Sequence, residues 1–404
     1  MADEPVDELG GKTPLEVANK PVIDSMVARG ETGLVKTVPD SIPPGSDAAN
    51  LSVMGYEPRK YCTGRSPLEA VSMGIPLTDT DVAFRCNLVT LSDNEAYASK
   101  TMIDHSSDEI ASDVAAELIR TVSQHLGTDE FRFYPGRSYR HLLVWHNGYT
   151  GNITTPPHDI LERTIAPYLP KGENSGAFLR MMEQSAILLH DHPVNIRRKE
   201  AGLRPANSIW LWGEGKRPAL PGFEKKYGLK GSIIAAVDLI LGIGICAGLK
   251  PVEVEGATGN MHSNFDGKAQ AAIEQLLHFG MDFVYLHIEA PDECGHRHEV
   301  DNKVKSIEII DRHIVAPIKK ALDASGEDYS IMVLPDHPTP LRLRTHTSDP
   351  VPYVIYRNTA GACRDAARHV STYNEKTGAS TGIYIEEGHR LMDRFIKKSK
   401  ISEC

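Results

Sequence analysis

Three groups of potential metal ligands lie next to predicted strands in the second half of the chain. They are Asp292 and His296 after a strand at 282–289, Asp336 and His337 after a strand at 329–334, and His346 before a strand at 351–356. Carboxylate oxygen and imidazole nitrogen together suit Mn²⁺, Zn²⁺ and related divalent ions. An Asp and a His four residues apart can face one ion, whereas an adjacent Asp-His pair can serve two. Because two metals roughly 4 Å apart clamp the entering and leaving oxygens of a phosphoryl group, the pattern indicates phosphoryl transfer.

A serine turn supplies a candidate nucleophile. Pro43-Pro44-Gly45 forces a turn after a strand at 33–38, and Ser46 then opens a run of helix formers that ends at Met54. The start of a helix favours an oxyanion, and a bound metal lowers the pKa of a hydroxyl. Ser46 and Asp47 could instead be simple helix caps, and Asp336-His337 a satisfied turn. Taken together, the three groups and the serine turn favour a site.

Alternating strands and helices position these groups. Beyond residue 230 we expect a core helix at 232–249, strands at 251–255, 282–289, 329–334 and 351–356, and helices at 266–279 and 302–324, the last one bent at Pro317. Such alternation predicts an α/β fold with a mostly parallel sheet and helices on both faces. Functional groups then gather beyond the carboxyl ends of the strands.

A chain of 404 residues predicts two domains. The expected core is discontinuous, 1–76 and 230–404, with an inserted α+β domain at 77–229. Within the insert we expect strands at 81–91, 131–133 and 138–146, and helices at 107–125 and 176–190. Guanidinium groups form bidentate hydrogen bonds with carboxylate and phosphate. The candidate substrate contacts are Arg65, placed in the core near the serine turn, and Arg85, Arg140, His141, Asp159 and Arg204 of the insert.

Composition narrows the partners. With 44 Lys and Arg against 54 Asp and Glu, the net charge is −10, which argues against non-specific nucleic-acid binding. The most apolar stretch, 232–249, contains Asp238 and several glycines, so no membrane span is expected. No signal peptide is visible, and the six scattered cysteines include no Cys-x-x-Cys pair. We expect a cytoplasmic protein. The sequence leaves its oligomeric state open.

Long strings of the sequence resemble one known family. They are LGGKTPLEVANKP, GLVKTVPDSIPPGSDAANLS, TGRSPLEA, TPPHDILER, PANSIWLWGEGK, EGATGNMHSNFDGKAQAA, HIEAPDECGH, LPDHPTP and RTHTSDPVPY. They resemble the cofactor-independent phosphoglycerate mutases of the archaeal type, found also in bacteria, which belong to the alkaline phosphatase superfamily. The resemblance runs over essentially the whole chain.

The resemblance implies a reaction and a set of roles. Ser46 matches the phosphorylated nucleophile; Asp292, His296 and His346 match one metal site; Asp336 and His337, with Ser46, match the other. Two divalent ions are implied, Mn²⁺ first and Mg²⁺, Co²⁺ or Zn²⁺ as alternatives, without 2,3-bisphosphoglycerate. The implied substrate is a small phosphorylated hydroxy acid, 3-phosphoglycerate, converted to 2-phosphoglycerate through a phosphoserine.

One departure from the family affects the serine-side metal. Family members begin with a strand that ends in Asp-Gly-Met, and that aspartate is a ligand of this metal. The present sequence matches from Met1 onward, and Asp3 cannot take the same position without rearrangement. Either the start codon is assigned too late or the chain is truncated. We expect the chain as written to bind the second metal poorly and to have little activity, and upstream residues to restore both.

Other functions fit parts of the pattern. Transfer to another hydroxyl compound is one, since some similar sequences are called homoserine kinases; however, the chain has no Gly-x-x-x-x-Gly-Lys-Ser/Thr loop for ATP. A metal-dependent phosphatase needs only the metal groups, and the arginines of the insert favour transfer over hydrolysis. A non-enzymatic binding role is a further alternative.

Overall fold

The computed structural model describes residues 1–93, 96–359 and 370–397. The chain forms two compact units, a core made of Met1–Cys62 and Leu220–Cys404 and an inserted unit made of Thr63–Ala219. The core therefore ends earlier, and resumes earlier, than the expected boundaries at 76 and 230. The reason is α5 (Ser66–Ser72), which packs on β2 and β6 of the inserted unit and takes Arg65 with it.

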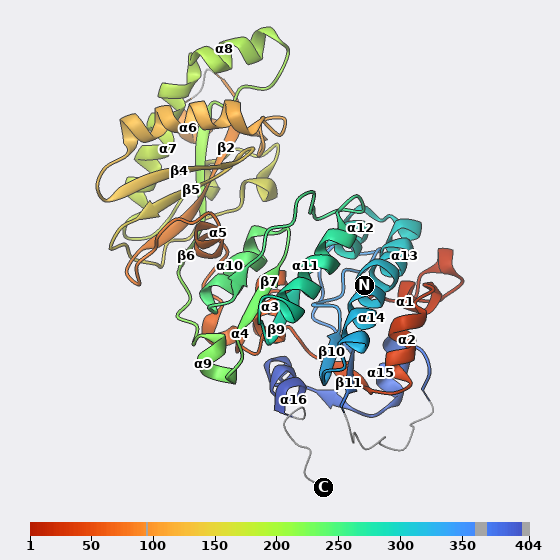
Figure 1. Ribbon diagram of the computed structural model, residues 1–404. Coiled ribbons are helices and arrows are strands. Elements are labelled where there is room, and N and C mark those ends of the chain that lie inside the picture. The colour runs from red at the N-terminus through yellow and green to blue at the C-terminus, as the bar shows by residue number, and fades with distance from the viewer. Residues whose placement is uncertain (94–95, 360–369, 398–404) are drawn as a thin grey trace. The chain divides into compact units, whose positions relative to one another are not determined.

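The core is an α/β unit with two sheets (Figure 1). In the first, β8 (Lys250–Pro251), β7 (Gly231–Ile234) and β9 (Phe283–Leu286) are parallel. The second has the order β10 (Tyr329–Val333), β11 (Val351–Asn358), β1 (Glu31–Val35) and β12 (Tyr384–Ile385). Here β11 is antiparallel to both neighbours and only β1 and β12 are parallel, so the pairing is more mixed than the expected mostly parallel sheet.

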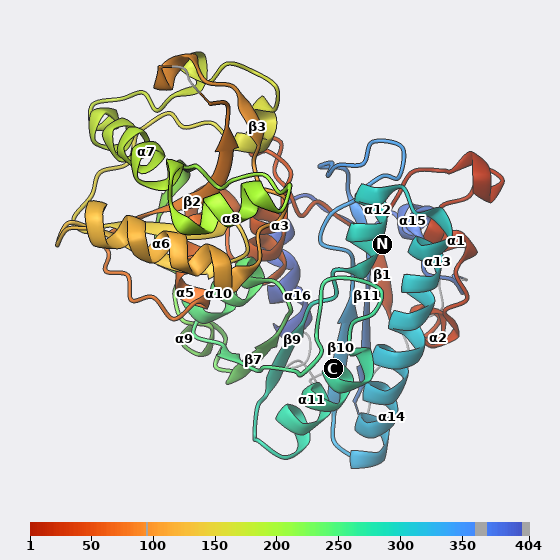
Figure 2. The same ribbon diagram turned by 90° about the horizontal axis from the view of Figure 1, so that it is seen from above.

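Helices lie on both sides of these strands (Figure 2). On one side are α11 (Phe265–Leu277), α13 (Val300–Ile309) and α14 (Ala316–Ser325). On the other are α3 (Ser46–Val53), α10 (Asp238–Cys246) and α16 (Leu391–Lys397). The remaining helices of the core are α1 (Pro14–Val17), α2 (Pro21–Val27), α4 (Pro58–Tyr61), α9 (Phe223–Tyr227), α12 (Ala290–Arg297) and α15 (Glu375–Ser380).

Two expected helices of the core differ from the observed ones. The stretch 232–249 begins as strand β7 and becomes helical only at α10, because Ser232-Ile233-Ile234 pair with β9. The helix expected at 302–324 is continuous, but α13 and α14 are joined by a π-helical segment, η5 (Ile310–Val315), just before Pro317. Proline has no N–H and crowds the carbonyl four residues earlier, so a wider turn replaces the expected bend.

The inserted unit is built on one antiparallel sheet. Its strands are β2 (Val82–Leu91), β3 (Met102–Asp104), β4 (Phe131–Arg137), β5 (Arg140–Trp145) and β6 (Ser208–Lys216), and β2 pairs with β3, β5 and β6. The helices are α5, α6 (Ser112–Leu126), α7 (Ser175–His190) and α8 (Pro193–Glu200). Apolar side chains of α6 and α7 and of one sheet face, such as Phe84 and Phe178, form its core.

The two ends of the inserted unit are tied to each other. The Thr63 hydroxyl donates to the Lys216 carbonyl at 2.5 Å. Gly64 has a φ of 107°, and a Cβ there would lie 2.7 Å from the Glu214 carbonyl oxygen. The entering segment is thus held against β6 near the point where the chain leaves the unit. No helix among the described residues is long and apolar enough to cross a membrane.

Candidate active site

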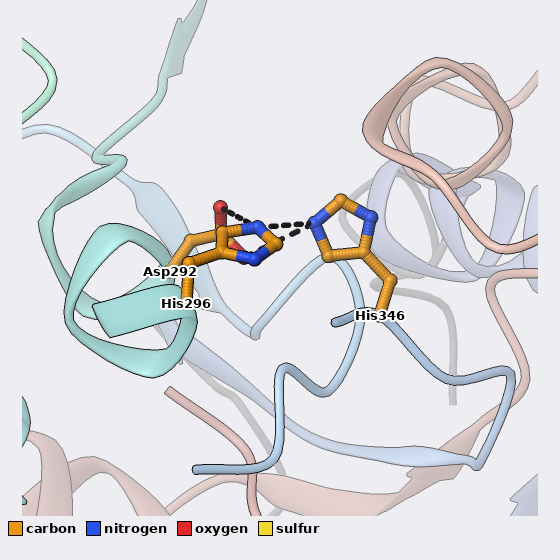
Figure 3. A group of neighbouring side chains, drawn as sticks. All are labelled: Asp292, His296 and His346. Carbon is orange, nitrogen blue, oxygen red and sulfur yellow. Dashed lines mark hydrogen bonds and ion pairs between the residues drawn. The ribbon is translucent and has the colours of Figure 1, made fainter. Parts of the chain in front are cut away.

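Asp292, His296 and His346 form a compact metal-type cluster (Figure 3). Asp292 lies in the first turn of α12, and His296 lies four residues later on the same side of the helix. His346 comes from the loop that precedes β11. Its Nε2 lies 3.0 Å from the His296 Nε2 and 3.4 Å from the Asp292 Oδ1. One ligand atom of each residue lies within 4.8 Å of the other two, so the three can surround one ion.

Hydrogen bonds orient this cluster. The His296 Nδ1 lies 2.9 Å from the Arg344 carbonyl, to which it donates, so its Nε2 faces the other two residues. The hydrogen bond to Asp292 raises the pKa of His296 to about 9. Burial opposes ionisation of Asp292, but the hydrogen bonds from His296 and His346 outweigh it and hold the pKa of that carboxyl well below its usual value. Without a metal, the carboxylate therefore carries an imidazolium partner.

Ser46, Asp336 and His337 form a second group. Ser46 is the first residue of α3, and its Oγ lies 3.1 Å from the His337 Nε2. The same nitrogen lies 3.4 Å from the Asp336 Oδ2. Asp336 is held ionised: burial raises its pKa, but the charge of His337 and the hydrogen bond and charge of His287 outweigh burial and bring the pKa well below its usual value. The three residues predicted for the serine-side metal thus lie together, and the group offers one carboxylate, one imidazole and one hydroxyl.

The two groups are in contact with each other through Thr339 and through neighbouring histidine rings. The Thr339 hydroxyl donates to the Asp292 Oδ1 and lies 3.3 Å from the His337 Nδ1. The rings of His337 and His346 have centroids 4.0 Å apart. Among the described residues, only the Asp292 cluster brings three carboxylate, imidazole or thiol ligands within reach of one point. The serine-side group therefore offers fewer metal-type ligands than the neighbouring Asp292 cluster.

Comparison with known proteins identifies the family. The model of 2,3-bisphosphoglycerate-independent phosphoglycerate mutases matches residues 28–195. An enzyme of that name from Methanosarcina mazei is 50% identical over 399 residues, covering 98% of this chain and 97% of the relative. The chain belongs to the 2,3-bisphosphoglycerate-independent phosphoglycerate mutase family.

Solved structures agree with this assignment. A cofactor-independent phosphoglycerate mutase from Thermoplasma acidophilum has a TM-score of 0.65 at 25% identity, covering 98% of this chain and 96% of its own. A protein from Pyrococcus horikoshii has a TM-score of 0.80 at 27% identity, covering 100% of this chain and 96% of its own. The α/β fold and the family predicted from the sequence are thereby confirmed.

A slot separates the two core sheets of this family member. One edge of β9 and one edge of β10 have no partner strand among the described residues, and both edges line a cavity of about 820 Å³. At 3.3 Å per residue, 4.8 Å between strands and 10 Å between layers, that volume corresponds to roughly five residues of strand. Met1, Ser46, Asp292 and Asp336 line it as well. Burial lowers the pKa of the Met1 amino group to about 6.

Asp3 does not complete the serine-side group. Its carboxylate lies 2.7 Å from the Lys303 Nζ, in an ion pair with no exposed surface, and accepts from the Leu341 backbone N–H. Lys303 also donates to the Thr339 carbonyl at 2.7 Å. The pair therefore fastens the first residues to the loop that carries His337 and Thr339.

The six candidate substrate contacts all lie in the inserted unit, in different settings. Two arginines face carboxylates: Arg85 pairs with Glu69 and lies over the Trp212 ring, and Arg204 lies 3.1 Å from Asp104. Burial lowers the pKa of His141 to about 3, so this side chain is neutral. The exposed candidates are Arg65, Arg140, Asp159 and also Arg204.

Two arginines and a second histidine lie near a histidine that was not among the predicted site residues. His158 stacks edge-on against Trp212, with ring centroids 5.4 Å apart, and lies near His105. Burial lowers its pKa, and the charges of His105, Arg85 and Arg65 act in the same direction. The groups around His158 come from separate strands and loops, whereas His158 itself stands in the string TPPHDILER, next to the predicted Asp159.

Proposed function

We propose that the chain interconverts 3-phosphoglycerate and 2-phosphoglycerate and that Ser46 carries the phosphoryl group between the two hydroxyls. The observation that supports this most directly is the place of Ser46: its Oγ lies 3.1 Å from the His337 Nε2 at the start of α3, beside the group that contains Asp336. Backbone N–H groups at a helix start stabilise the negative charge that develops on a phosphoryl group.

In this proposal Asp292, His296 and His346 hold one divalent ion, and Asp336, His337 and Ser46 hold a second. Mn²⁺ is the first choice, with Mg²⁺, Co²⁺ and Zn²⁺ as alternatives, and 2,3-bisphosphoglycerate is not needed. When bound, such ions polarise the phosphoryl oxygens and lower the pKa of a bound hydroxyl. The fit rests on the donor set, which is oxygen and imidazole nitrogen throughout.

The proposed reaction has two half-steps. Ser46 Oγ forms a bond to phosphorus as the bond from phosphorus to the 3-oxygen of glycerate breaks, and the proton lost by the serine balances the one gained by that oxygen. The second half-step is the reverse on the 2-oxygen. The inserted unit supplies the binding of the glycerate, and the guanidinium groups of Arg65 and Arg85, beside His105 and His158, are the proposed contacts for its negative charge.

We further propose that the slot between β9 and β10 takes one extended strand and that an acidic residue at the end of this strand completes the serine-side group. Two strand edges that have no partner strand within residues 1–93, 96–359 and 370–397 favour this occupant over a compact ligand. The slot is lined on one side by Ile310, Ile314 and Ile318, which suits apolar strand residues.

The test measures conversion of 3-phosphoglycerate in the presence of Mn²⁺ and without bisphosphoglycerate. It compares the chain as written with one that carries a strand-forming N-terminal extension. Phosphate labelled in the substrate should be retained on the protein, and Ser46→Ala should abolish both retention and conversion. Ser41→Ala, an exposed serine of the same loop, is the control and should behave as the parent. Mutase activity that survives Ser46→Ala would exclude the phosphoserine route, and release of free phosphate alone would indicate a phosphatase.

A further inference from the structure

Asn50 lies between the candidate nucleophile and the neighbouring carboxylate. It occupies the position one turn after Ser46 on α3, and its side chain is fully buried. The Asn50 Nδ2 donates to the Ser46 carbonyl at 2.8 Å and to the Asp336 Oδ2 at 2.9 Å. Both N–H groups of one amide nitrogen are therefore used, one on each side of the site.

Tyr285 completes the hydrogen bonding of this amide. The tyrosine comes from β9, and its hydroxyl lies 2.6 Å from the Asn50 Oδ1. If the amide were turned over, its oxygen would face the Ser46 carbonyl and the Asp336 carboxylate, which are both acceptors, and two hydrogen bonds would be replaced by repulsion. Burial raises the pKa of Tyr285 well above its usual value, so the hydroxyl keeps its proton and can donate.

The connection joins three separate elements. Ser46 and Asn50 belong to α3, Tyr285 to β9, and Asp336 follows β10. Asp336 has a second fixed contact, from the His337 backbone N–H to its Oδ1 at 3.0 Å. The carboxylate is thus held at both oxygens, and Asn50, like the His337 side chain, contacts both Asp336 and Ser46.

We propose that Asn50 is a positioning residue that sets the distance between Ser46 and Asp336, with Tyr285 acting only through Asn50. This inference rests on the proposed function, because it concerns the geometry of the same phosphoryl transfer. Contacts that orient metal ligands typically change activity or metal affinity by about 10- to 100-fold when removed. Asn50 makes no contact with the glycerate in this proposal, so substrate affinity should stay unchanged.

The experiment compares Asn50→Leu and Tyr285→Phe with the parent, in the more active of the two forms described above. Asn50→Leu should lower kcat and the rate of Ser46 phosphorylation by about 10- to 100-fold, leave KM within about threefold, and raise the Mn²⁺ concentration needed for thermal stabilisation. Tyr285→Phe should lower kcat by roughly fivefold, as expected for one hydrogen bond. In the Asn50→Leu background, Tyr285→Phe should cause no further loss.

Two controls separate positioning from general loss of stability. Tyr353→Phe removes another buried hydroxyl, which bonds Glu31. Asn195→Leu removes another buried amide, which bonds the Leu189 and Ala206 carbonyls. Neither control should change kcat or the Mn²⁺ response.

Parent-like kcat and Mn²⁺ response in Asn50→Leu would overturn the inference, as would an undiminished Tyr285→Phe effect in its background. If Asn50→Leu does not fold, Tyr285→Phe against Tyr353→Phe decides, and equal rates would overturn it. An inactive parent, by contrast, would contradict the proposed function itself.

Discussion

Metal binding at the Asp292 cluster should release a proton from His296. The imidazole Nε2 faces Asp292 at 3.3 Å, and this contact raises the pKa of His296 to about 9. A metal ligand must be the neutral ring. At neutral pH, an incoming ion therefore competes with a proton, because the pKa of His296 is about two units above that pH.

The size of the effect follows from that pKa. Each pH unit below about 9 weakens the apparent affinity tenfold, which gives up to ~100-fold between pH 9 and pH 7. The His296 side chain is 35% exposed, so screening by water and salt reduces this, and we expect a change of roughly 10- to 100-fold. Apparent Mn²⁺ affinity should thus rise with pH over this range.

The assay is calorimetric titration with Mn²⁺ at several pH values, each in two buffers of different ionisation enthalpy, which counts released protons. Near neutral pH about one proton should leave per ion bound to this cluster. His296→Gln should remove the release. His298→Asn is the control, since His298 lies two residues away and bonds the Leu341 carbonyl instead. An affinity that is independent of pH, or a proton release that persists in His296→Gln, would refute the reasoning.

Three further predictions follow from the same contacts. For the metal-free protein, the raised pKa of His296 means that its contribution to stability is complete below about pH 6.5 and is lost as the pH rises through about 9, which thermal unfolding against pH would detect. Lys303→Met leaves the buried Asp3 carboxylate without its partner and should lower the free energy of unfolding by about 3–5 kcal/mol, whereas adding Asp3→Asn should recover part of the loss in denaturant titrations. A strand-forming extension ending in Asp-Gly before Met1 should raise activity and serine-side Mn²⁺ affinity at least about tenfold. The control extension, which ends in Asn-Gly, should stabilise the core without that gain. Equal activity of the short and extended proteins would refute the slot proposal.

The sequence indicated the parts of the site that depend on local chemistry. Ser46 was expected at a helix start because Pro43-Pro44-Gly45 cannot continue a regular element, and α3 begins there. Asp292 and His296 could be paired by their spacing on a helix, and His346 follows from the family resemblance. These features need only short stretches of chain, or a motif that has a fixed spacing.

Long-range geometry was out of reach for the same methods. The role of Asn50 could not be predicted locally, because it depends on contacts with residues that are distant in the sequence, Tyr285 on β9 and Asp336 after β10. Two features of the fold depend on tertiary contacts rather than on the period of apolar residues. One is the antiparallel direction of β11, and the other is the packing of α5 on the inserted unit. The same holds for the residues around His158, which together span more than 90 positions of the sequence.

The fastening of Thr63 and Gly64 against β6 has an evolutionary and practical consequence. A module whose two termini meet can be removed from its host, or transplanted into another, by joining neighbouring points, without stretching either backbone. Grafting experiments on this scaffold should therefore cut the chain near Thr63 and Lys216, where the two ends of the inserted unit lie together.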